Sequence, residues 1–256
     1  MTQDVLFSHE GHVATITLNR PHKLNAVTPE MSEAIIKAVD SFNRDDNVRC
    51  VVVTGAGEKA FCAGSDIREL DSYDTPWNFR NRPDYCDAIR RLRKPTIAAI
   101  NGYALGGGLE TSLSCDIRIA SDKATFAAPE IKLGWIGGGG MATFLHQSIG
   151  PSNAALMLMT GDPIDAAKAL AWGLVSDVVA QSELIPRVQS IAAVIASRAP
   201  IAAEHAKLNL RAAVSMVQEK AIEYERDLQT ICFATDDAAE GRAAFKEKRA
   251  PRFRRR

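Results

Sequence analysis

NGYALGGGLETSLSCD, residues 101–116, decides the fold because three consecutive glycines join an apolar run to a helix start. The residues that lead into it, KPTIAAING (94–102), are mostly apolar and partly β-branched, which predicts a buried strand. Each glycine weakens a helix by roughly 0.8–1 kcal/mol relative to alanine, so a run of three indicates backbone that approaches another group closely. The stretch therefore predicts a strand followed by a short helix whose first N–H groups face a close neighbour.

The flanking sequence predicts an alternation of strands and helices. Thr28 is a suitable N-cap and Pro29 a suitable first residue for a helix over about 29–44, and a loop is predicted for residues 55–67. Strands that are followed by helices at uneven spacing favour an α/β core over a β-sandwich. The further predicted strands are HVATITLN (12–19), CVVVTG (50–55) and DIRIA (116–120).

The character of the chain changes near Pro200, where two long helical stripes of apolar residues begin. Few elements remain after them to cover these stripes, so they either pack back on the core or meet another subunit. We expect a core over residues 1–198 and a helical region for assembly over residues 199–256. The stripes are Ile201, His205, Leu208 and Ala212, and then Ala221, Tyr224, Leu228 and Ile231.

Composition narrows the class of protein. Lysine plus arginine equals aspartate plus glutamate, 31 each, so no net charge steers the chain toward nucleic acid or an anionic membrane. The five cysteines form no C-x-x-C pair, which argues against a disulfide framework and a zinc cage. The N-terminus, MTQDVLFSHE, lacks the pattern of a signal peptide, and no apolar run reaches the roughly 20 residues that span a bilayer. We expect a soluble cytoplasmic protein.

Two glutamates are candidates for acid–base chemistry. Glu110 follows Gly107 by one helical turn, and helical side chains lean toward the N-terminus, so its carboxylate is expected over the Gly107 N–H. Glu130 stands 20 residues later, among Ala127, Ala128 and Ile131, whose apolar side chains are expected to raise its pKa. Two carboxylates in different surroundings can divide acid and base roles. The alternative is structural: Glu110 favoured by the helix dipole, and Glu130 a surface residue at a turn.

A third candidate element is AFCAGSDI (60–67), in which small residues allow backbone N–H groups to reach a ligand. One such N–H together with that of Gly107 would form a two-donor oxyanion hole. Other chemistries lack their motifs, because the chain contains no complete G-x-G-x-x-G, G-x-S-x-G, H-E-x-x-H or P-loop and its histidines are scattered. We therefore expect no metal site.

Six segments in this order resemble the crotonase (enoyl-CoA hydratase/isomerase) superfamily along nearly the whole chain. The resemblance implies a spiral of repeated β-β-α turns with a C-terminal helical region, assembled as a homotrimer or a dimer of trimers. It also implies an acyl-CoA substrate, a role in fatty acid metabolism, and no cofactor apart from the coenzyme A of the substrate. The segments are LNRPHKLNAVT, VVVTGAGEKAFCAGSDI, KPTIAAINGYALGGGLE, SCDIRIASDKATFAAPEIKLG, MTGDPIDAAKALAWGLVSDVV and FKEKRAPRF.

The resemblance also implies roles for individual residues. Ser65 and Gly107 would hold the thioester oxygen through their backbone N–H groups. Ala63 would lie beside the adenine of coenzyme A, with Asp66 starting the following turn and Lys23 (beside His22) near the coenzyme phosphates. Glu110 and Glu130 match the two catalytic glutamates, Gly138 matches a glycine that helps place the water, and Trp135 is either a wall of the acyl pocket or a core residue.

The paired glutamates imply syn hydration of a 2-enoyl-CoA, or the reverse dehydration, by a hydratase-like lyase. Glu110 would chiefly assist attack of water at C3 and Glu130 would deliver a proton to C2. The alternatives are an acyl-CoA double-bond isomerase and a thioester or C–C hydrolase of the same superfamily. A different class is RNA binding through the basic tail FKEKRAPRFRRR.

Two departures from the family pattern concern the acyl pocket. Where hydratases often read I-P-G-A-G-G, this chain reads IGGGG (136–140), so loss of the proline frees the loop that places the water. The stretch 71–88 is expected to shape the acyl end, and its Trp77, Phe79, Arg80 and Arg82 fit either a bulky or an acidic acyl group.

Overall fold

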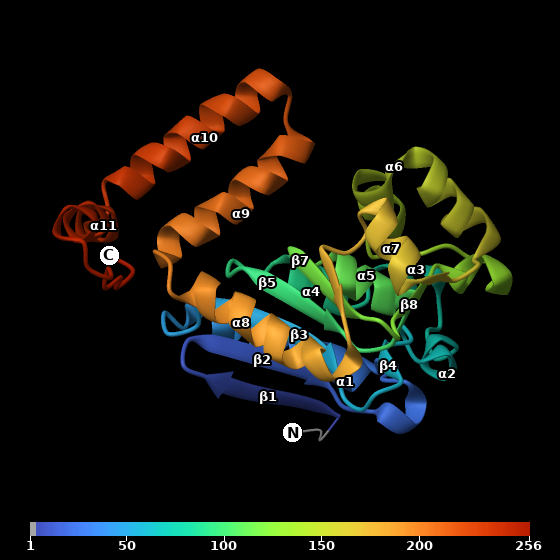
Figure 1. The fold of residues 1–256 in the computed structure, drawn as a ribbon. Coiled ribbons are helices and arrows are strands. Elements are labelled where there is room, and N and C mark those ends of the chain that lie inside the picture. Colours follow the sequence, from blue (N-terminus) through green and yellow to red (C-terminus); the bar gives the residue numbers. More distant parts are fainter. Residues whose placement is uncertain (1–3) are drawn as a thin grey trace.

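The computed structural model describes residues 4–256 and contains two mixed sheets with helices around them (Figure 1). Residues 1–3, the start of the N-terminal segment MTQDVLFSHE in which no signal peptide was expected, lie outside the described residues. The six-stranded sheet has the order β1-β2-β3-β5-β7-β10, and the four-stranded sheet the order β4-β6-β8-β9. The strands are β1 Val5–Glu10, β2 Val13–Leu18, β3 Cys50–Gly55, β4 Ala60–Cys62, β5 Thr96–Ile100, β6 Tyr103–Leu105, β7 Ile117–Ser121, β8 Thr125–Ala127, β9 Ile164–Asp165 and β10 Asp177–Val179.

Successive strands alternate between the two sheets, and this alternation produces the expected spiral. β3, β5 and β7 lie side by side in parallel in the large sheet, and each is followed at once by β4, β6 or β8 in the small one. Helices then return the chain for the next turn. The fold is therefore the predicted α/β spiral of β-β-α turns.

The helices and turns of the first part of the chain are α1 Pro29–Arg44, α2 Ile67–Leu70, α3 Pro76–Arg80, α4 Tyr85–Arg90, α5 Gly107–Leu113, α6 Met141–Thr160, α7 Ala166–Trp172 and α8 Leu184–Ala196, with 3₁₀ turns η1 Pro21–Lys23, η2 Pro129–Leu133 and η3 Gln181–Glu183. The main core lies between the large sheet and helices such as α1 and α5, and a second cluster lies under α8 on the other face. The predicted helix begins as expected, because the Thr28 side chain accepts a hydrogen bond from the Met31 N–H. None of the helices described here combines the length and apolarity needed to cross a bilayer.

The loop predicted for residues 55–67 is wrong for Ala60–Cys62, which forms the buried strand β4. A strand of three residues is too short to show an alternation in sequence. β4 pairs with β6, and the chain that leaves β4 passes directly over the start of α5. This strand therefore positions residues 63–66 beside the glycine run.

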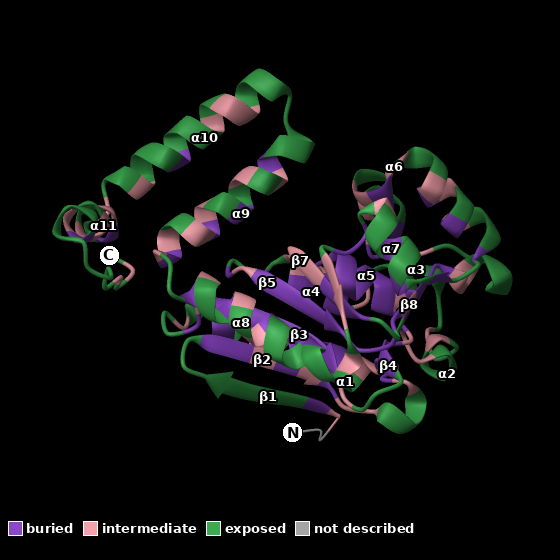
Figure 2. Cartoon of the chain, in the orientation of Figure 1, coloured by how far each residue is buried: buried purple, intermediate pink, exposed green. Residues whose placement is uncertain are grey.

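The last three helices, α9 Pro200–Ser215, α10 Gln218–Phe233 and α11 Asp236–Glu247, extend away from the sheets and are mostly exposed (Figures 1 and 2). α9 and α10 pack side by side and bury Ala212 and Leu228 between them. Leu208 and Ile231 stay 36% and 53% exposed, so the two stripes cover each other only in part.

Candidate functional site

One cavity, about 150 Å³ in volume, is lined by most of the site residues that the sequence predicted. These residues come from four separate segments of the chain. The segment after β4, the start of α5, η2 and the glycine-rich loop before α6 meet there. Since the segments are far apart in sequence, only the spiral brings them together. The predicted residues that line the cavity are Ala63, Ser65, Gly107, Glu110, Glu130, Trp135 and Gly138.

Each glycine of the run 106–108 has its own steric cause. A Cβ at Gly106 would lie 2.8 Å from Oε1 of Glu130, and Gly106 also has a φ of +54°. A Cβ at Gly107 would collide with the Tyr85 hydroxyl, and one at Gly108 with the Cys62 carbonyl. The close neighbours expected from the sequence are therefore a carboxylate, a hydroxyl and a peptide group of this chain.

Two backbone N–H groups belong to residues that line the cavity from adjoining segments, Ser65 and Gly107. An isolated β-bridge joins Val27 and Ser65. In it the Val27 N–H donates to the Gly64 carbonyl at 2.8 Å, and the Asp66 N–H donates to the Val27 carbonyl at 2.9 Å. The Ser65 N–H takes no part in the bridge. Gly107 is the first residue of α5, where an N–H has no helical acceptor. Within residues 4–256 neither N–H donates a hydrogen bond to a protein acceptor. A Cβ on Gly107 would lie 3.5 Å from the Ser65 nitrogen, so the two donors are neighbours.

Glu110 is 6% exposed and lies on the first turns of α5. Its Oε1 accepts hydrogen bonds from the Gly139 N–H at 2.7 Å and the Met141 N–H at 3.4 Å. Burial raises the pKa of Glu110 to about 7; the Gly139 bond lowers it, and the charges of Glu130 and Asp84 raise it further. A carboxyl group with this pKa exchanges protons near neutral pH.

Glu130 stands at the start of η2, with its carboxylate beside Gly106, and both residues line the cavity. Its Oε2 is buried and has no hydrogen-bond partner among the described residues. Desolvation raises the pKa of Glu130, in the direction expected from its neighbours Ala127 and Ala128, both 3% exposed. Ile131 was expected to contribute too, but it is 42% exposed. A buried carboxyl oxygen without a partner is costly and can be satisfied by a bound molecule.

Two residues near the cavity were missed by sequence reasoning. The buried Tyr85 hydroxyl lies 3.3 Å from Ser65 Oγ and contacts Gly107, and burial raises the pKa of Tyr85 so that it stays neutral. Arg90 Nη1 donates to the Gly139 carbonyl at 3.1 Å. Both lie on α4, whose buried face of Tyr85, Cys86, Ala88 and Ile89 has helical spacing and was the signal available in the sequence.

The remaining predicted residues lie differently. Trp135 is 40% exposed and lines the cavity, so it is a wall residue rather than a core residue. The Asp66 carboxylate is held by Arg20 at 3.2 Å and by the Arg68 N–H, as the N-cap of α2. Lys23 is exposed on η1 and does not line the cavity.

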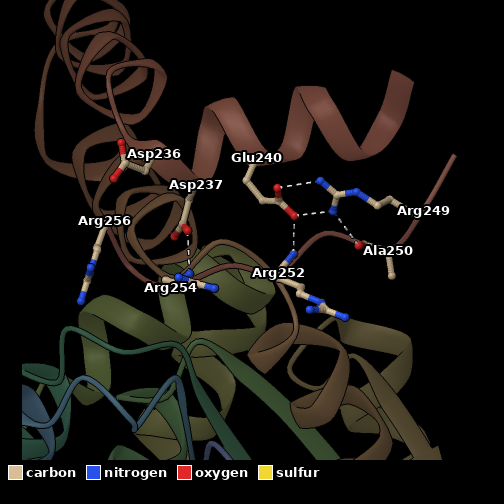
Figure 3. Close-up of a pocket in the computed structure, with 8 residues that line it drawn as sticks. All are labelled: Asp236, Asp237, Glu240, Arg249, Ala250, Arg252, Arg254 and Arg256. Atoms are coloured by element: carbon tan, nitrogen blue, oxygen red, sulfur yellow. Dashed lines mark hydrogen bonds and ion pairs between the residues drawn. The ribbon is translucent and has the colours of Figure 1, made fainter. Parts of the chain in front are cut away.

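A larger hollow of about 690 Å³ lies between α11 and the C-terminal tail (Figure 3). Two of its carboxylates already have partners: Glu240 accepts from the Arg249 guanidinium, and Asp237 accepts from the backbone N–H groups of Arg254 and Arg255. The Arg249 hydrogen bond lowers the pKa of Glu240 to about 2, so this carboxylate carries no proton to donate at neutral pH. The glutamates with raised pKa values, Glu110 and Glu130, therefore line the smaller cavity and not this hollow.

Comparison with known proteins gives similarity over nearly the whole chain. The family model described as "Enoyl-CoA hydratase/isomerase" matches residues 8–256. A probable mitochondrial enoyl-CoA hydratase of Dictyostelium discoideum is 41% identical over 94% of this chain and 87% of its own length. The (E)-benzylidenesuccinyl-CoA hydratase of Thauera aromatica is 40% identical over 95% and 96%. The crystal structure of enoyl-CoA hydratase from Bacillus anthracis superposes with a TM-score of 0.95 at 35% identity, covering 99% of this chain and all of that one.

Proposed function

Because the chain belongs to the enoyl-CoA hydratase/isomerase family, we propose that it adds water to a 2-enoyl-CoA to give a 3-hydroxyacyl-CoA, or catalyses the reverse dehydration. Relatives at about this level of identity carry hydratase names, which supports a hydratase-like lyase. The observation that carries the proposal is the pair Glu110 and Glu130. Both have raised pKa values and line one cavity, together with two N–H groups that have no acceptor among residues 4–256.

In this proposal the N–H groups of Ser65 and Gly107 form an oxyanion hole. The Ser65 nitrogen lies close to Gly107, so both N–H groups can donate to one carbonyl oxygen. As water adds at C3, the electrons of the C2–C3 double bond move toward the thioester and its oxygen becomes negative. Each donor of this kind typically stabilises such a state by about 2.7–4 kcal/mol.

The two glutamates divide the proton transfers. Gly139 and Met141 hold Oε1 of Glu110, so its other oxygen is left to accept the proton of the attacking water. The water oxygen bonds to C3, and Glu130 in its protonated form gives its proton to C2. Both groups face one cavity, so both bonds form on the same face of the substrate. The proton gained by Glu110 then returns to Glu130 through solvent.

The coenzyme is proposed to approach along Ala63, the lining residue that directly follows β4. Lys23 is exposed to solvent, and its flexible ammonium group is suited to binding a coenzyme phosphate. Asp66 contributes through its backbone and its cap of α2, because its carboxylate is engaged by Arg20.

The first test is a hydration assay with crotonyl-CoA and longer 2-enoyl-CoAs, followed by the loss of enoyl absorbance. Glu110→Gln and Glu130→Gln should each lower kcat by about 10²–10⁴-fold, with coenzyme binding kept, because a general acid or base contributes that much. Glu33→Gln on the exposed face of α1 is the matched control and should be fully active. Release of free thiol without loss of the double bond would contradict hydration and favour a hydrolase.

We also propose a homotrimer or a dimer of trimers that assembles through the helical region 199–256, with residues 1–198 as the core. Large apolar side chains remain on α9 and α10 and beyond, including Leu210, Phe233 and Phe245 at 68%, 65% and 87% exposure. Light scattering should give three or six times the chain mass of 27.7 kDa. A monomer would contradict the proposal.

A cytoplasmic location is the last part of the proposal. The cysteines are free thiols, and four of the five are buried, which suits a reducing compartment. Cell fractionation tests it, and recovery with mitochondria would contradict it.

A further inference from the structure

The cavity that holds the two glutamates has largely apolar walls. Leu70, Phe79 and Leu133 are among the residues that line it. Among the described residues that line it, Arg82 is the only cation. A guanidinium on a largely apolar wall is a candidate for binding an anion, because burying a charge is costly unless it is fully paired.

The Arg82 side chain is held in place by uncharged groups. Its guanidinium lies over the Phe79 ring, 4.2 Å from the centroid, and Nη1 donates to the Phe79 carbonyl at 2.8 Å. The side chain is 20% exposed. Stacking and one hydrogen bond from the same residue fix the plane of the fork, so little conformational entropy is lost when a ligand binds.

The acidic partner of Arg82 is only weakly engaged. Asp84 Oδ2 lies 3.5 Å from Nη2, at the outer limit of a hydrogen bond. The other Asp84 oxygen, Oδ1, accepts from the Cys86 and Asp87 N–H groups and caps α4. Asp84 is thus committed mainly to the helix, and a guanidinium with five N–H donors keeps capacity for another acceptor.

We propose that Arg82 binds a carboxylate at the far end of the acyl group, so that the preferred substrate is a 2-enoyl-CoA with an ω-carboxylate. This inference rests on the proposed hydratase function, since it names the substrate of that same cavity. The apolar wall contacts the methylene groups, and the arginine fork matches a carboxylate in two parallel hydrogen bonds. The acyl carboxylate is thereby kept away from Glu110 and Glu130.

The test compares 5-carboxypent-2-enoyl-CoA with hex-2-enoyl-CoA, which differ only in the terminal group. The intact enzyme should have a kcat/KM for the carboxylated substrate at least about 10-fold above that for the neutral one. Arg82→Met keeps length and apolar contact but removes the charge. It should lower this ratio by about 10–100-fold, the effect expected for a charged hydrogen bond, and Arg82→Lys should restore part of it.

The matched control is Arg80→Met, because Arg80 lies on the same segment but is exposed, stacks on Trp77 at 5.7 Å and does not line the cavity. It should leave the ratio unchanged. An unchanged ratio in Arg82→Met, an equal loss in Arg80→Met, or a preference of the intact enzyme for the neutral substrate would each overturn the proposal. Hydration of neither substrate would instead reject the hydratase function.

Inhibition of the unaltered enzyme gives a second readout that needs no variant. Glutaryl-CoA and pentanoyl-CoA have equal chain lengths, and only the first carries an ω-carboxylate. Glutaryl-CoA should be the stronger competitive inhibitor, and its advantage should shrink as salt rises. Equal inhibition constants would overturn the inference.

Discussion

Glu110 shows how a single residue acquires a working pKa from opposing effects. The residue is 6% exposed, and this burial favours the protonated carboxyl, yet the Gly139 N–H at 2.7 Å favours the ionised form. Negative charges on Glu130 and Asp84 shift the balance back toward the proton. Because these contributions come from different segments, the sequence around Glu110 does not reveal the result.

Asp84→Asn tests this balance. The substitution keeps an oxygen that can cap α4 but removes a charge that raises the pKa of Glu110. In the proposed mechanism Glu110 must be ionised, so the acidic limb of the kcat/KM profile, near pH 7 in the intact enzyme, should move to lower pH. Asp71→Asn, at an exposed position of the same segment, should not move it. An immobile limb in Asp84→Asn would contradict this account of Glu110.

The raised pKa also predicts a pH-dependent stability. Unfolded Glu110 loses its proton near 4.5 but the folded residue only near 7, so the intact protein loses stability as pH rises between these values. Glu110→Gln cannot ionise and escapes this loss. The free energy of unfolding of Glu110→Gln, minus that of the intact protein, should therefore increase from pH 5 to pH 8, by at most about 3 kcal/mol. Urea denaturation at both pH values measures the difference, and Glu33→Gln should show none.

Among elements, the glycine-rich loop before α6 depends on α4 for its position. Residues 137–140 of this loop are all glycine, without the proline that the resemblance to hydratases leads one to expect after Ile136. Arg90 donates a hydrogen bond to the Gly139 carbonyl at 3.1 Å, and the Gly139 N–H donates one to the Glu110 carboxylate. A side chain from another element therefore fixes backbone that the loop sequence leaves free.

Arg90→Met should release this loop. The Gly139 N–H would then hold Glu110 less firmly, so kcat should fall by about 10–100-fold, KM should change little, and the acidic limb of kcat/KM should move to higher pH. Arg91→Met, at the exposed C-cap residue of α4, is the control. Loss of stability with an unmoved pH profile would indicate that Arg90 supports only the fold.

The elements that were predictable are the ones that carry their own signal. α1 has an N-cap and a proline at its start, and β3 and β5 are continuous apolar runs. β4, β6 and β8 have three residues each and exist because they pair with one another, which no local pattern records. The candidate site was partly predictable for the same reason: Glu110 and the glycines stand in one motif, whereas Tyr85 and Arg90 reach the site only through tertiary packing.

On the scale of the whole molecule, buried charges tie the C-terminal helices to the core. Glu204 of α9 is 5% exposed, lies 3.2 Å from Lys94 Nζ and is bonded by the Arg255 guanidinium. Arg255 Nε also meets Asp46 at 2.7 Å. The tail after α11 thus returns to the core, although the helices before it extend outward (Figure 1).

Arg255→Ala should weaken this connection. Glu204 would lose a charged partner while remaining buried, and the free energy of unfolding should fall by about 1–3 kcal/mol. Arg252→Ala removes an exposed arginine of the same tail and should change it by less than about 0.5 kcal/mol. Equal effects in urea denaturation would show that the tail acts through general charge rather than through Glu204.

The glycine run of residues 106–108 has no room for side chains, which limits where the cavity can be changed by mutation. Any side chain added there strikes Glu130, Tyr85 or Cys62, so libraries that seek new thioester substrates gain nothing from randomising it. The segment that carries Phe79 and Arg82 is bound by no such restriction and is partly open to solvent. Directed evolution of acyl preference should therefore diversify that segment and leave the glycines untouched.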